Sequence, residues 1–454
     1  MKKYLFLATV LILSIQLATA QEIIRRDPII SNMVEEISRD NIEAYIEKLV
    51  SFHTRHNLSA QDDPEKGIGA AWNWVKQEIE QYIPGSGGRL SVEFVNYSVG
   101  GEGQRIDRQI ELRNVIATLQ GTDPGDDRIL IMSAHLDSRV EDNYDATTFA
   151  PGANDDGSGV AAILELVRIM SKHEFPATIK FMILTGEEHG LYGASAMADI
   201  ASEENWNITA LLNNDMIGNS SSSGTLLNDN MRVRVFSEGV PAYETEAMAR
   251  MRAYTSGEND GRARQLARYI KEVGERYVDQ IEVSLVYRND RFGRGGDHTP
   301  FCRKGFTAVR ICEFNENYNR THTTPGERDG IMYGDLPEGV DYEYVRKNAG
   351  INLASLANLA LAPAEPLNAG IVVSGLSNST TLTWEKPAGG AEPAGYYILM
   401  RETHRSMWEK KIFVQGTEVT LPYSKDNYFF AVQSVDADGH ESLPVFPGPA
   451  RRRR

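Results

Sequence analysis

Strand-like and helix-like segments alternate through the central part of this chain. The strand-like segments are apolar runs at 114–119, 128–134, 178–184, 210–214, 281–286 and 307–312. Helical spacing of apolar residues is found at 159–170 and 262–278 between them, and at 29–52 and 67–82 before them. Residues 220–224 and 256–261 are expected to be loops around an insertion. Because parallel strands need crossover helices, the alternation predicts an α/β fold with a mixed, mostly parallel sheet flanked by helices.

Carboxylate and imidazole side chains stand at the ends of several of these segments. They are His135 and Asp137, Asp155 and Asp156, Glu187 and Glu188, and Asp215, with His298 and His322 further along the chain. Ligands of open α/β sheets bind beyond the carboxyl ends of the strands, so these side chains are expected to meet there. Carboxylates and imidazoles are suitable ligands for zinc or a similar divalent ion. The series therefore predicts a metal-dependent hydrolase.

Each motif, taken alone, also fits an ordinary structural role. His135 and Asp137 could be a hydrogen-bonded pair, because alternate residues of an extended segment share a face. The acidic pair of A-N-D-D-G-S-G begins a helix, where a carboxylate often caps free backbone amides. A lone Asp215 would ordinarily be a cap or turn residue. Adjacent carboxylates on a turn point in different directions, so one of Glu187 and Glu188 can bind metal while the other removes a proton from metal-bound water.

The composition is that of a globular protein. The 454 residues include 41% hydrophobic and 24% charged side chains, and a chain of this length predicts two folded units. The net charge of −16 argues against nucleic acid as a partner.

The beginning of the chain resembles a secretory signal peptide. A basic Lys-Lys start precedes an apolar stretch at 4–17 and a small-residue site, which predicts cleavage after Ala20. No other stretch approaches the about 18 apolar residues that a membrane-spanning helix needs. We therefore expect a signal peptide at 1–20, no transmembrane segment, and a mature protein that is secreted or periplasmic.

The character of the sequence changes near residue 362. Short alternating strand-like segments follow at 380–384, 395–402, 411–415 and 427–435, with no helix-like segment between them. This pattern predicts an all-β sandwich at 366–450, after a first domain at 21–362. The segments T-L-T-W-E-K-P, Y-Y-I-L-M-R and Y-F-F-A-V-Q-S-V resemble a fibronectin type III module, in which Trp384 and the aromatic residues 428–430 would pack the core.

Cys302 and Cys312 are the only cysteines of the chain. In an oxidising compartment they could form a disulfide that closes a short loop. They could equally be two small buried residues on a helix and on the strand that follows it.

In combination, the motifs resemble those of the co-catalytic dizinc aminopeptidases. H-L-D-S, N-D-D-G-S-G, T-G-E-E-H-G-L-Y-G, N-D-M-I-G, D-H-T-P-F and H-T-T occur in the order of that family, over about residues 40–360. The family includes bacterial leucyl-type aminopeptidases, and glutamate carboxypeptidase II and glutaminyl cyclase are relatives. The resemblance implies a zinc exopeptidase-like fold for 21–362, with two zinc ions per chain.

The resemblance also implies which side chains hold the metal and which do the chemistry. The implied ligands are His135 and Asp215 for one zinc ion, Glu188 and His322 for the other, and Asp155 as the bridge between them. Two residues are implied to be catalytic: Glu187 as the general base and later the proton donor, and Asp137 as the residue that orients the first histidine.

His298 and His322 compete for the place of the distal histidine. His298 begins a helix in D-H-T-P-F, but the family's ligand lies about two dozen residues later, in an H-T/S-x-x-D setting that His322 begins to match. We expect His322 to be the ligand and His298 to line the substrate pocket. The sequence departs from the pattern after His322, and Glu327 or Asp329 is expected to replace the missing acidic residue.

Together these features predict a secreted zinc aminopeptidase, which removes N-terminal residues from peptides with a water activated by two zinc ions. Three alternatives remain open. A glutaminyl cyclase would use one zinc ion on the same scaffold. A carboxypeptidase acting on acidic C-termini would need a basic pocket, for which Arg288, Arg291 and Arg294 are candidates. A non-catalytic receptor-like protein would be expected to have lost metal ligands, and this chain has every one.

Overall fold

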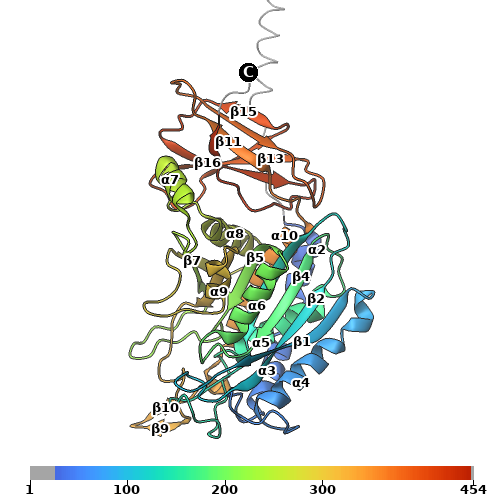
Figure 1. The fold of residues 1–454 in the computed structure, drawn as a ribbon, viewed down its shortest axis with the longest axis vertical. Helices are drawn as coiled ribbons and strands as arrows, with labels where there is room; N and C mark the ends of the chain where they lie inside the picture. Colours follow the sequence, from blue (N-terminus) through green and yellow to red (C-terminus); the bar gives the residue numbers. More distant parts are fainter. Residues whose placement is uncertain (1–25, 451–454) are drawn as a thin grey trace, which may run out of the picture.

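The computed structural model describes residues 26–450, and at its centre is an eight-stranded sheet (Figure 1). The order of strands across the sheet is β1-β2-β4-β3-β5-β8-β6-β7. Their bounds are β1 Leu90–Val99, β2 Ile110–Leu119, β3 Arg128–His135, β4 Thr178–Leu184, β5 Asn207–Asn214, β6 Arg232–Phe236, β7 Glu282–Val286 and β8 Ala308–Glu313. The predicted signal peptide, with its cleavage site after Ala20, lies outside the described residues.

The middle of the sheet is parallel. β3 pairs in parallel with β4 and β5, and β5 pairs in parallel with β8. β1 and β2 add an antiparallel edge beside β4, and β6 runs antiparallel to β8. The predicted α/β class with a mixed sheet is therefore confirmed. The four parallel strands end at the same edge of the sheet, which is where the predicted ligands were expected to meet.

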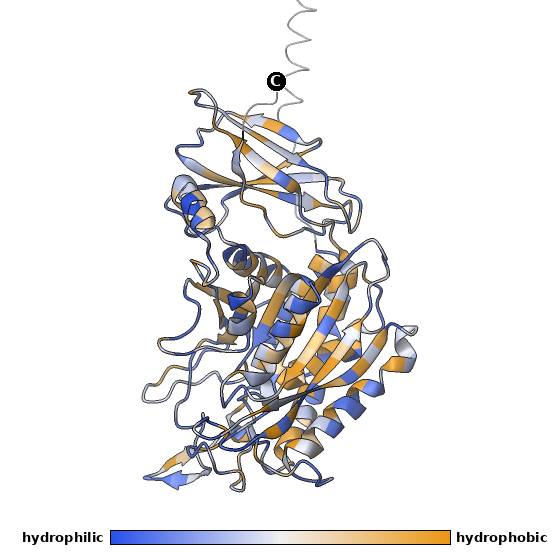
Figure 2. Cartoon of the chain, viewed as in Figure 1, coloured by the Kyte–Doolittle hydropathy of each residue, from blue (hydrophilic) through white to orange (hydrophobic). Residues whose placement is uncertain are grey.

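Helices cover both faces of the sheet. Their bounds are α2 Pro28–Glu35, α3 Arg39–Val50, α4 Gly67–Glu80, α5 Gly157–Met170, α6 Tyr192–Glu203, α7 Glu246–Thr255, α8 Arg262–Tyr277, α9 His298–Arg303 and α10 Tyr342–Leu361. Leu130 and Met132 of β3 pack into an apolar cluster with α5, α8 and α10, whereas Ile131 packs on the other side with α6 and α9. In Figure 2 the central strands are accordingly coloured mostly as hydrophobic.

Several elements were not evident from the periodicity of the sequence. The strand β1 and the helices α6 and α10 were not predicted. Most residues of α10 are buried, so this helix lacks the polar stripe that marks a surface helix. The helical run expected at 29–52 is divided into α2 and α3, because Ser38 caps α3 by accepting a hydrogen bond from the amide of Asn41. The insertion between the two expected loops contains β6 and α7.

Two smaller sheets follow the last helix, with the orders β15-β12-β11-β17 and β14-β13-β16. Their strands are β11 Leu367–Val372, β12 Thr380–Glu385, β13 Gly395–Glu402, β14 Lys410–Val414, β15 Glu418–Leu421, β16 Tyr428–Val435 and β17 Gly448–Ala450. Side chains from both sheets, among them Trp384, Ile398 and Phe430, share one buried cluster, so the pair forms a β-sandwich. Its fibronectin type III character stays a prediction.

Buried ion pairs join the sandwich to the rest of the molecule. Asp260, just before α8, binds Arg268 of α8 at 3.1 Å and Arg401 of β13 at 2.6 Å. Glu441 of the sandwich likewise binds one cation of α8 and one of β14, at 2.9 and 2.8 Å. We refer to the residues of these pairs as the docking cluster: Asp260, Arg268, Arg276, Arg401, Lys411 and Glu441.

A histidine links the sandwich to the start of α2. His440 Nε2 lies 2.8 Å from Oδ2 of Asp27, and Nδ1 lies 2.7 Å from Oδ2 of Asp436. Asp27 also caps α2 by accepting a hydrogen bond from the amide of Ile29 at 2.8 Å. The cap of the first described helix is therefore also a contact of the sandwich.

Two further predictions can be compared with the structure. Cys302 of α9 and Cys312 of β8 are buried and form no disulfide, so the interpretation as two small buried residues is confirmed. Within residues 26–450, none of the helices combines the length and the hydropathy of a bilayer span.

Candidate metal centre

Five side chains of the predicted ligand set meet at the carboxyl edge of the sheet. His135 ends β3, Asp155 precedes α5, Glu188 follows β4, Asp215 follows β5, and His322 lies in the loop after β8. All are buried except the partly exposed His322. We refer to these five residues as the metal-ligand cluster.

The ligand atoms of this cluster form two groups that share one carboxylate. His135 Nε2 lies 3.1 Å from Oδ1 of Asp155 and 4.0 Å from Oδ1 of Asp215. His322 Nε2 lies 2.9 Å from Oδ2 of Asp155 and 2.9 Å from Oε2 of Glu188. Within each group the ligand atoms all lie within 4.8 Å of one another. The two oxygens of Asp155 therefore face two different groups.

The donor atoms fit zinc. Each group offers one imidazole nitrogen together with carboxylate oxygens, the combination that zinc accepts in proteins. In addition, Oε1 of Glu188 is buried and has no hydrogen-bond partner among the described residues. A buried carboxylate oxygen without a partner is costly unless a cation or water binds it. The residues are therefore suited to hold two ions, one in each group.

Negative charge is in excess around the cluster. Burial and the neighbouring carboxylates raise the pKa of Glu187, and the same causes raise the pKa of Asp297 to about 7. Burial alone would lower the pKa of His322, but the carboxylates of Glu188 and Asp155 raise it to about 10. Bound cations would relieve a buried excess of this kind.

Asp137 orients His135, but with its backbone and not with its side chain. Nδ1 of His135 lies 3.8 Å from Oδ1 of Asp137, too far for a hydrogen bond, and 3.0 Å from the backbone carbonyl of Asp137. The carboxylate instead accepts hydrogen bonds from the amides of Gly186, Glu187 and Glu188, at 2.8, 3.2 and 3.1 Å. The expected contact between the Asp137 carboxylate and His135 is therefore wrong, because the carboxylate binds these three amides instead. Asp137 thereby fixes the loop that carries Glu187.

The second acidic residue of A-N-D-D-G-S-G is a helix cap. Asp156 accepts hydrogen bonds from the amides of Gly159 in α5, His135 in β3 and Met216 after β5, at 3.1, 3.1 and 3.2 Å. The capping interpretation therefore applies to Asp156, and the ligand-like position belongs to Asp155. The cap also ties α5 to the ends of two strands.

Asp335 supports the shared carboxylate and was missed in the sequence. Its carboxylate accepts hydrogen bonds from the backbone amides of Asn154, at 2.9 and 3.0 Å, and of Asp155, at 2.7 Å. Burial raises the pKa of Asp335 to about 7. Glu327 and Asp329, one of which was expected to supply the acidic residue that follows and supports His322, are both exposed. That expectation was wrong.

A β-hairpin explains the error. β9 Gly326–Arg328 and β10 Ile331–Tyr333 are joined by Asp329 and Gly330, whose φ angles are 53° and 77°. Asp-Gly is a strong sequence signal for a two-residue hairpin turn with positive φ at both positions. The Asp-Gly pair was therefore a sequence signal for this hairpin. Because the chain folds back there, Gly334 donates a hydrogen bond to Thr323, and Asp335 lies close to the position after His322.

Arg55 is a second residue that was missed. Its guanidinium is fully buried and donates hydrogen bonds to the carbonyls of Leu136, Pro151 and Gly152, at 2.6, 2.6 and 2.8 Å. It joins the loop after β3 to the loop before α5, and so fixes His135 relative to Asp155. An arginine between two polar residues carries no sequence signal for such a role.

The structure separates the two candidate distal histidines. His298 is fully buried, with Nε2 at 2.9 Å from the carbonyl of Asn289, and it is not among the residues that line the adjacent cavity. The expectation that it lines the pocket is therefore wrong. His322 contacts the ligand groups, and its Nδ1 lies 2.8 Å from a guanidinium nitrogen of Arg139.

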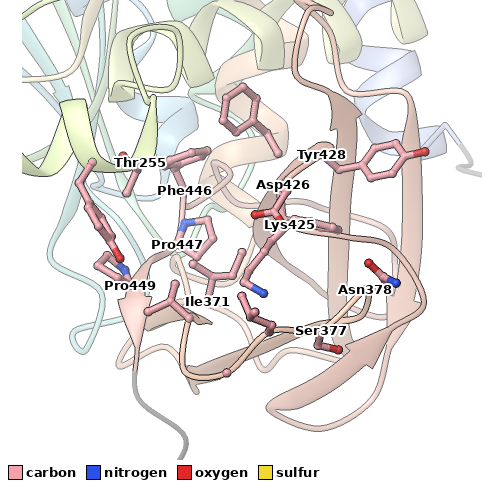
Figure 3. Close-up of a pocket in the computed structure, with 16 residues that line it drawn as sticks. Thr255, Ile371, Ser377, Asn378, Lys425, Asp426, Tyr428, Phe446, Pro447 and Pro449 are labelled. Atoms are coloured by element: carbon pink, nitrogen blue, oxygen red, sulfur yellow. The ribbon is translucent and has the colours of Figure 1, made fainter.

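A cavity of about 290 Å³ opens beside both ligand groups. Glu187 lies in its wall together with four members of the metal-ligand cluster. A larger cavity, of about 730 Å³, lies against the sandwich and is lined by Thr255, Tyr428 and Phe446 among others (Figure 3). Asp426 is its only carboxylate, and none of the potential metal groups of the described residues lies there. Chemistry, not size, therefore identifies the candidate site.

Known proteins resemble this chain in sequence and in fold. Residues 114–338 match the sequence profile of peptidase family M28. The chain is 43% identical over 421 residues to a probable zinc metalloprotease of Leptosphaeria maculans, covering 92% of this chain and 97% of that protein. A probable zinc metalloprotease of Pyricularia oryzae is also 43% identical, over 91% of this chain and 83% of that protein. Among solved structures, the LapA aminopeptidase of Legionella pneumophila shares the fold with a TM-score of 0.52 and 20% identity, over 76% of this chain and 78% of that chain.

Proposed function

This chain belongs to peptidase family M28 and is a zinc metallopeptidase, and from this premise we propose that it removes N-terminal residues from peptides with two zinc ions. The observation that carries the proposal is Asp155, whose two oxygens face two separate groups of potential ligands. Glu187 lies in the wall of the cavity beside them. Two adjacent metal positions beside an available carboxylate suit hydrolysis of a peptide bond.

Each group of the metal-ligand cluster would hold one ion. The proposed ligands are His135 and Asp215 for the first, Glu188 and His322 for the second, and Asp155 for both. When bound, the two ions supply Lewis-acid activation of water and of the scissile carbonyl, and an anchor for the free α-amine.

Glu187 carries the proton transfers in the proposed reaction. Its carboxylate takes a proton from the attacking water and then gives it to the nitrogen of the leaving peptide. Asp137, which binds the amides of residues 186–188, holds the Glu187 loop in place for both steps.

The alternative activities differ in what they require. A cyclase with one zinc ion would need a single ligand group, whereas Asp155 belongs to two. A receptor-like protein without activity would not need Glu187 in the cavity wall. One observation favours carboxypeptidase activity as the second candidate: Arg291 and Arg294 line the cavity, although Arg288 does not.

We also propose that the protein is secreted or periplasmic, with cleavage after Ala20, and that its domains are 21–362 and 366–450. The composition of residues 1–20 supports the first part of this proposal. The change from the large mixed sheet to two small sheets at Leu367 supports the second.

Replacement Glu187→Gln tests the function. We expect turnover of leucyl p-nitroanilide to fall about 10²- to 10⁴-fold, the usual contribution of a general base, while zinc content stays at about two per chain by elemental analysis. Glu327→Gln, on the exposed hairpin, is the control and should leave both quantities unchanged. Undiminished activity of Glu187→Gln, or equal hydrolysis of N-acetylated peptides by the unaltered protein, would contradict the proposal.

A further inference from the structure

Arginine is concentrated in the cavity beside the metal-ligand cluster. Of the 17 residues that line it, four are arginines: Arg105, Arg139, Arg291 and Arg294. In the whole chain Lys and Arg together are 47 of 454 residues, so arginine is enriched in the wall of this cavity. Those arginines that are not paired within the wall can bind negative charge on a ligand.

Two of these arginines are already bound to carboxylates of the protein. Arg291 lies 2.6 Å from Glu316, and Arg139 lies 3.0 Å from Glu188. Their charges are therefore largely balanced within the cavity wall.

The other two arginines are available. Arg105 and Arg294 are exposed, and among the described residues neither forms an ion pair with a carboxylate. Arg105 donates a hydrogen bond to the neutral amide oxygen of Asn143, at 3.2 Å. They come from different loops, before β2 and after β7, and converge on one cavity.

The net charge of the cavity also favours an anionic ligand. Four arginines and five carboxylates line it, which gives a formal charge of about −1, and two divalent ions would change this to about +3. Negative charge on the substrate would therefore add a favourable electrostatic interaction with the loaded cavity.

Burial indicates where on the substrate this charge should be. His135, Asp155 and Asp215 are buried, whereas Arg105 and Arg294 are exposed, so the arginines lie nearer to the mouth of the cavity. A peptide residue spans about 3.5 Å, so a substrate whose scissile bond lies at the ligand groups places its next residue toward the mouth.

We propose that Arg105 and Arg294 bind a carboxylate on the residue that follows the scissile bond, so that the preferred substrates are short peptides with negative charge there. This inference rests on the proposed function and specifies its substrate class. The carboxylate can be an aspartate or glutamate side chain or the C-terminus of a dipeptide, since a guanidinium binds both with the same paired hydrogen bonds.

Three matched substrates test the proposal: leucyl-glutamate α-amide, leucyl-glutamine and leucyl-glutamine amide. They carry a side-chain carboxylate, a terminal carboxylate and no carboxylate. We expect the neutral amide to have a KM about tenfold higher than the better of the other two, with a similar kcat, because two rim cations each contribute modestly. Whichever charged peptide has the lower KM shows whether the arginines bind a side-chain carboxylate or a terminal carboxylate.

Four variants identify the residues responsible. Arg105→Gln and Arg294→Gln should each reduce the preference about threefold, through KM, because exposed charge pairs contribute little individually. Arg108→Gln and Arg288→Gln are matched controls on the same loops, since Arg108 pairs with Asp107 and Arg288 stacks on Phe292 outside the cavity lining. Equal KM values for the three substrates, or equal effects of variants and controls, would overturn the proposal.

A binding measurement separates this inference from the proposed function. The zinc-loaded protein is titrated calorimetrically with analogues of the three peptides in which CH₂–NH replaces the peptide bond. Selective binding of the carboxylate-bearing analogues, reduced in Arg105→Gln and in Arg294→Gln, supports the inference even where no peptide is hydrolysed. Unselective binding rejects it, while absence of hydrolysis alone rejects only the proposed function.

Discussion

The docking cluster and the metal-ligand cluster are both buried and charged, but they are built differently. In the docking cluster each carboxylate binds two cations, as Asp260 does with Arg268 and Arg401. The metal-ligand cluster brings three carboxylates together with two imidazoles, and two arginines reach it, Arg139 and Arg310, each bound to one carboxylate of the cluster. Carboxylates that are each paired with two cations form a structural junction, whereas carboxylates that outnumber the neighbouring arginines leave a site that binds cations.

The largest expected effect comes from the shared carboxylate. Asp155→Asn should lower the occupancy of both zinc ions and reduce peptidase activity at least about 10³-fold, because NH₂ replaces one of the two oxygens and both ligand groups lose the negative charge that they share. In the presence of a chelator, the variant should unfold at a lower temperature than the unaltered protein, because two imidazoles hold the pKa of Asp155 well below its usual range and its charge therefore stabilises the folded state. Elemental analysis and thermal unfolding measure the two effects, with Asp329→Asn as an exposed control. Full occupancy of both ions in Asp155→Asn would remove the contrast between the clusters.

Replacement in the docking cluster should lower stability without changing metal binding or activity. Asp260→Asn leaves two buried arginines without their carboxylate, which should lower the free energy of unfolding by about 3–5 kcal/mol. Zinc content and kcat of the folded protein should not change. Urea unfolding provides the measurement, and Glu365→Gln is the control, because its pair with the half-exposed Arg262 should contribute less than about 1 kcal/mol. Equal losses in the free energy of unfolding for Asp260→Asn and Glu365→Gln would show that burial does not determine how much these ion pairs contribute.

A smaller effect is expected from Asp335, which binds the backbone beside the ligands. Asp335→Asn should weaken zinc binding about 10- to 100-fold, as replacements of residues that support metal ligands commonly do. Competition with a chelator measures this affinity. Glu338→Gln, in the short turn before α10, is the control. Asp341→Asn is unsuitable as a control because Asp341 caps α10. Unchanged zinc affinity would show that the amides of residues 154 and 155 hold their positions without Asp335.

The smallest effect concerns the pH dependence of stability. Burial lowers the pKa of His440, but Asp436 and Asp27 raise it above its ordinary value. Since the folded pKa is the higher one, the stabilisation is complete below the unfolded pKa of about 6.5 and is lost as pH rises through the folded pKa. The stability difference between the unaltered protein and His440→Gln should therefore shrink from pH 5.5 to pH 9. The exposed His404→Gln should show no such trend; a constant difference for His440→Gln would contradict the argument.

The sequence predicted the central strands and the meeting of the ligands because both depend on local patterns. β3 and β4 are uninterrupted apolar runs, and the parallel arrangement brings their carboxyl ends to one edge. His135 and Glu188 directly follow such runs, so their approach could be inferred without knowledge of any individual contact. By contrast, α10 was missed because polar residues such as Asn348, Asn352 and Asn358 are buried together with its apolar ones, so its sequence lacks the polar stripe of a surface helix.

The residues that support the ligands could not be predicted for a different reason. Asp137 and Asp335 bind backbone amides, and Arg55 binds backbone carbonyls. Every residue other than proline has the same amide and carbonyl, so such contacts require no particular partner in the sequence. The docking cluster was missed as well, because its charged side chains would be expected on the surface.

The contact between Asp27 and His440 has a consequence for how the protein matures. These residues are 413 positions apart in the chain. During synthesis, α2 is therefore made long before the sandwich that contacts its cap residue. Contacts of such long range form late, after the loop between them has been closed. The junction can thus be completed only when nearly the whole chain has been made.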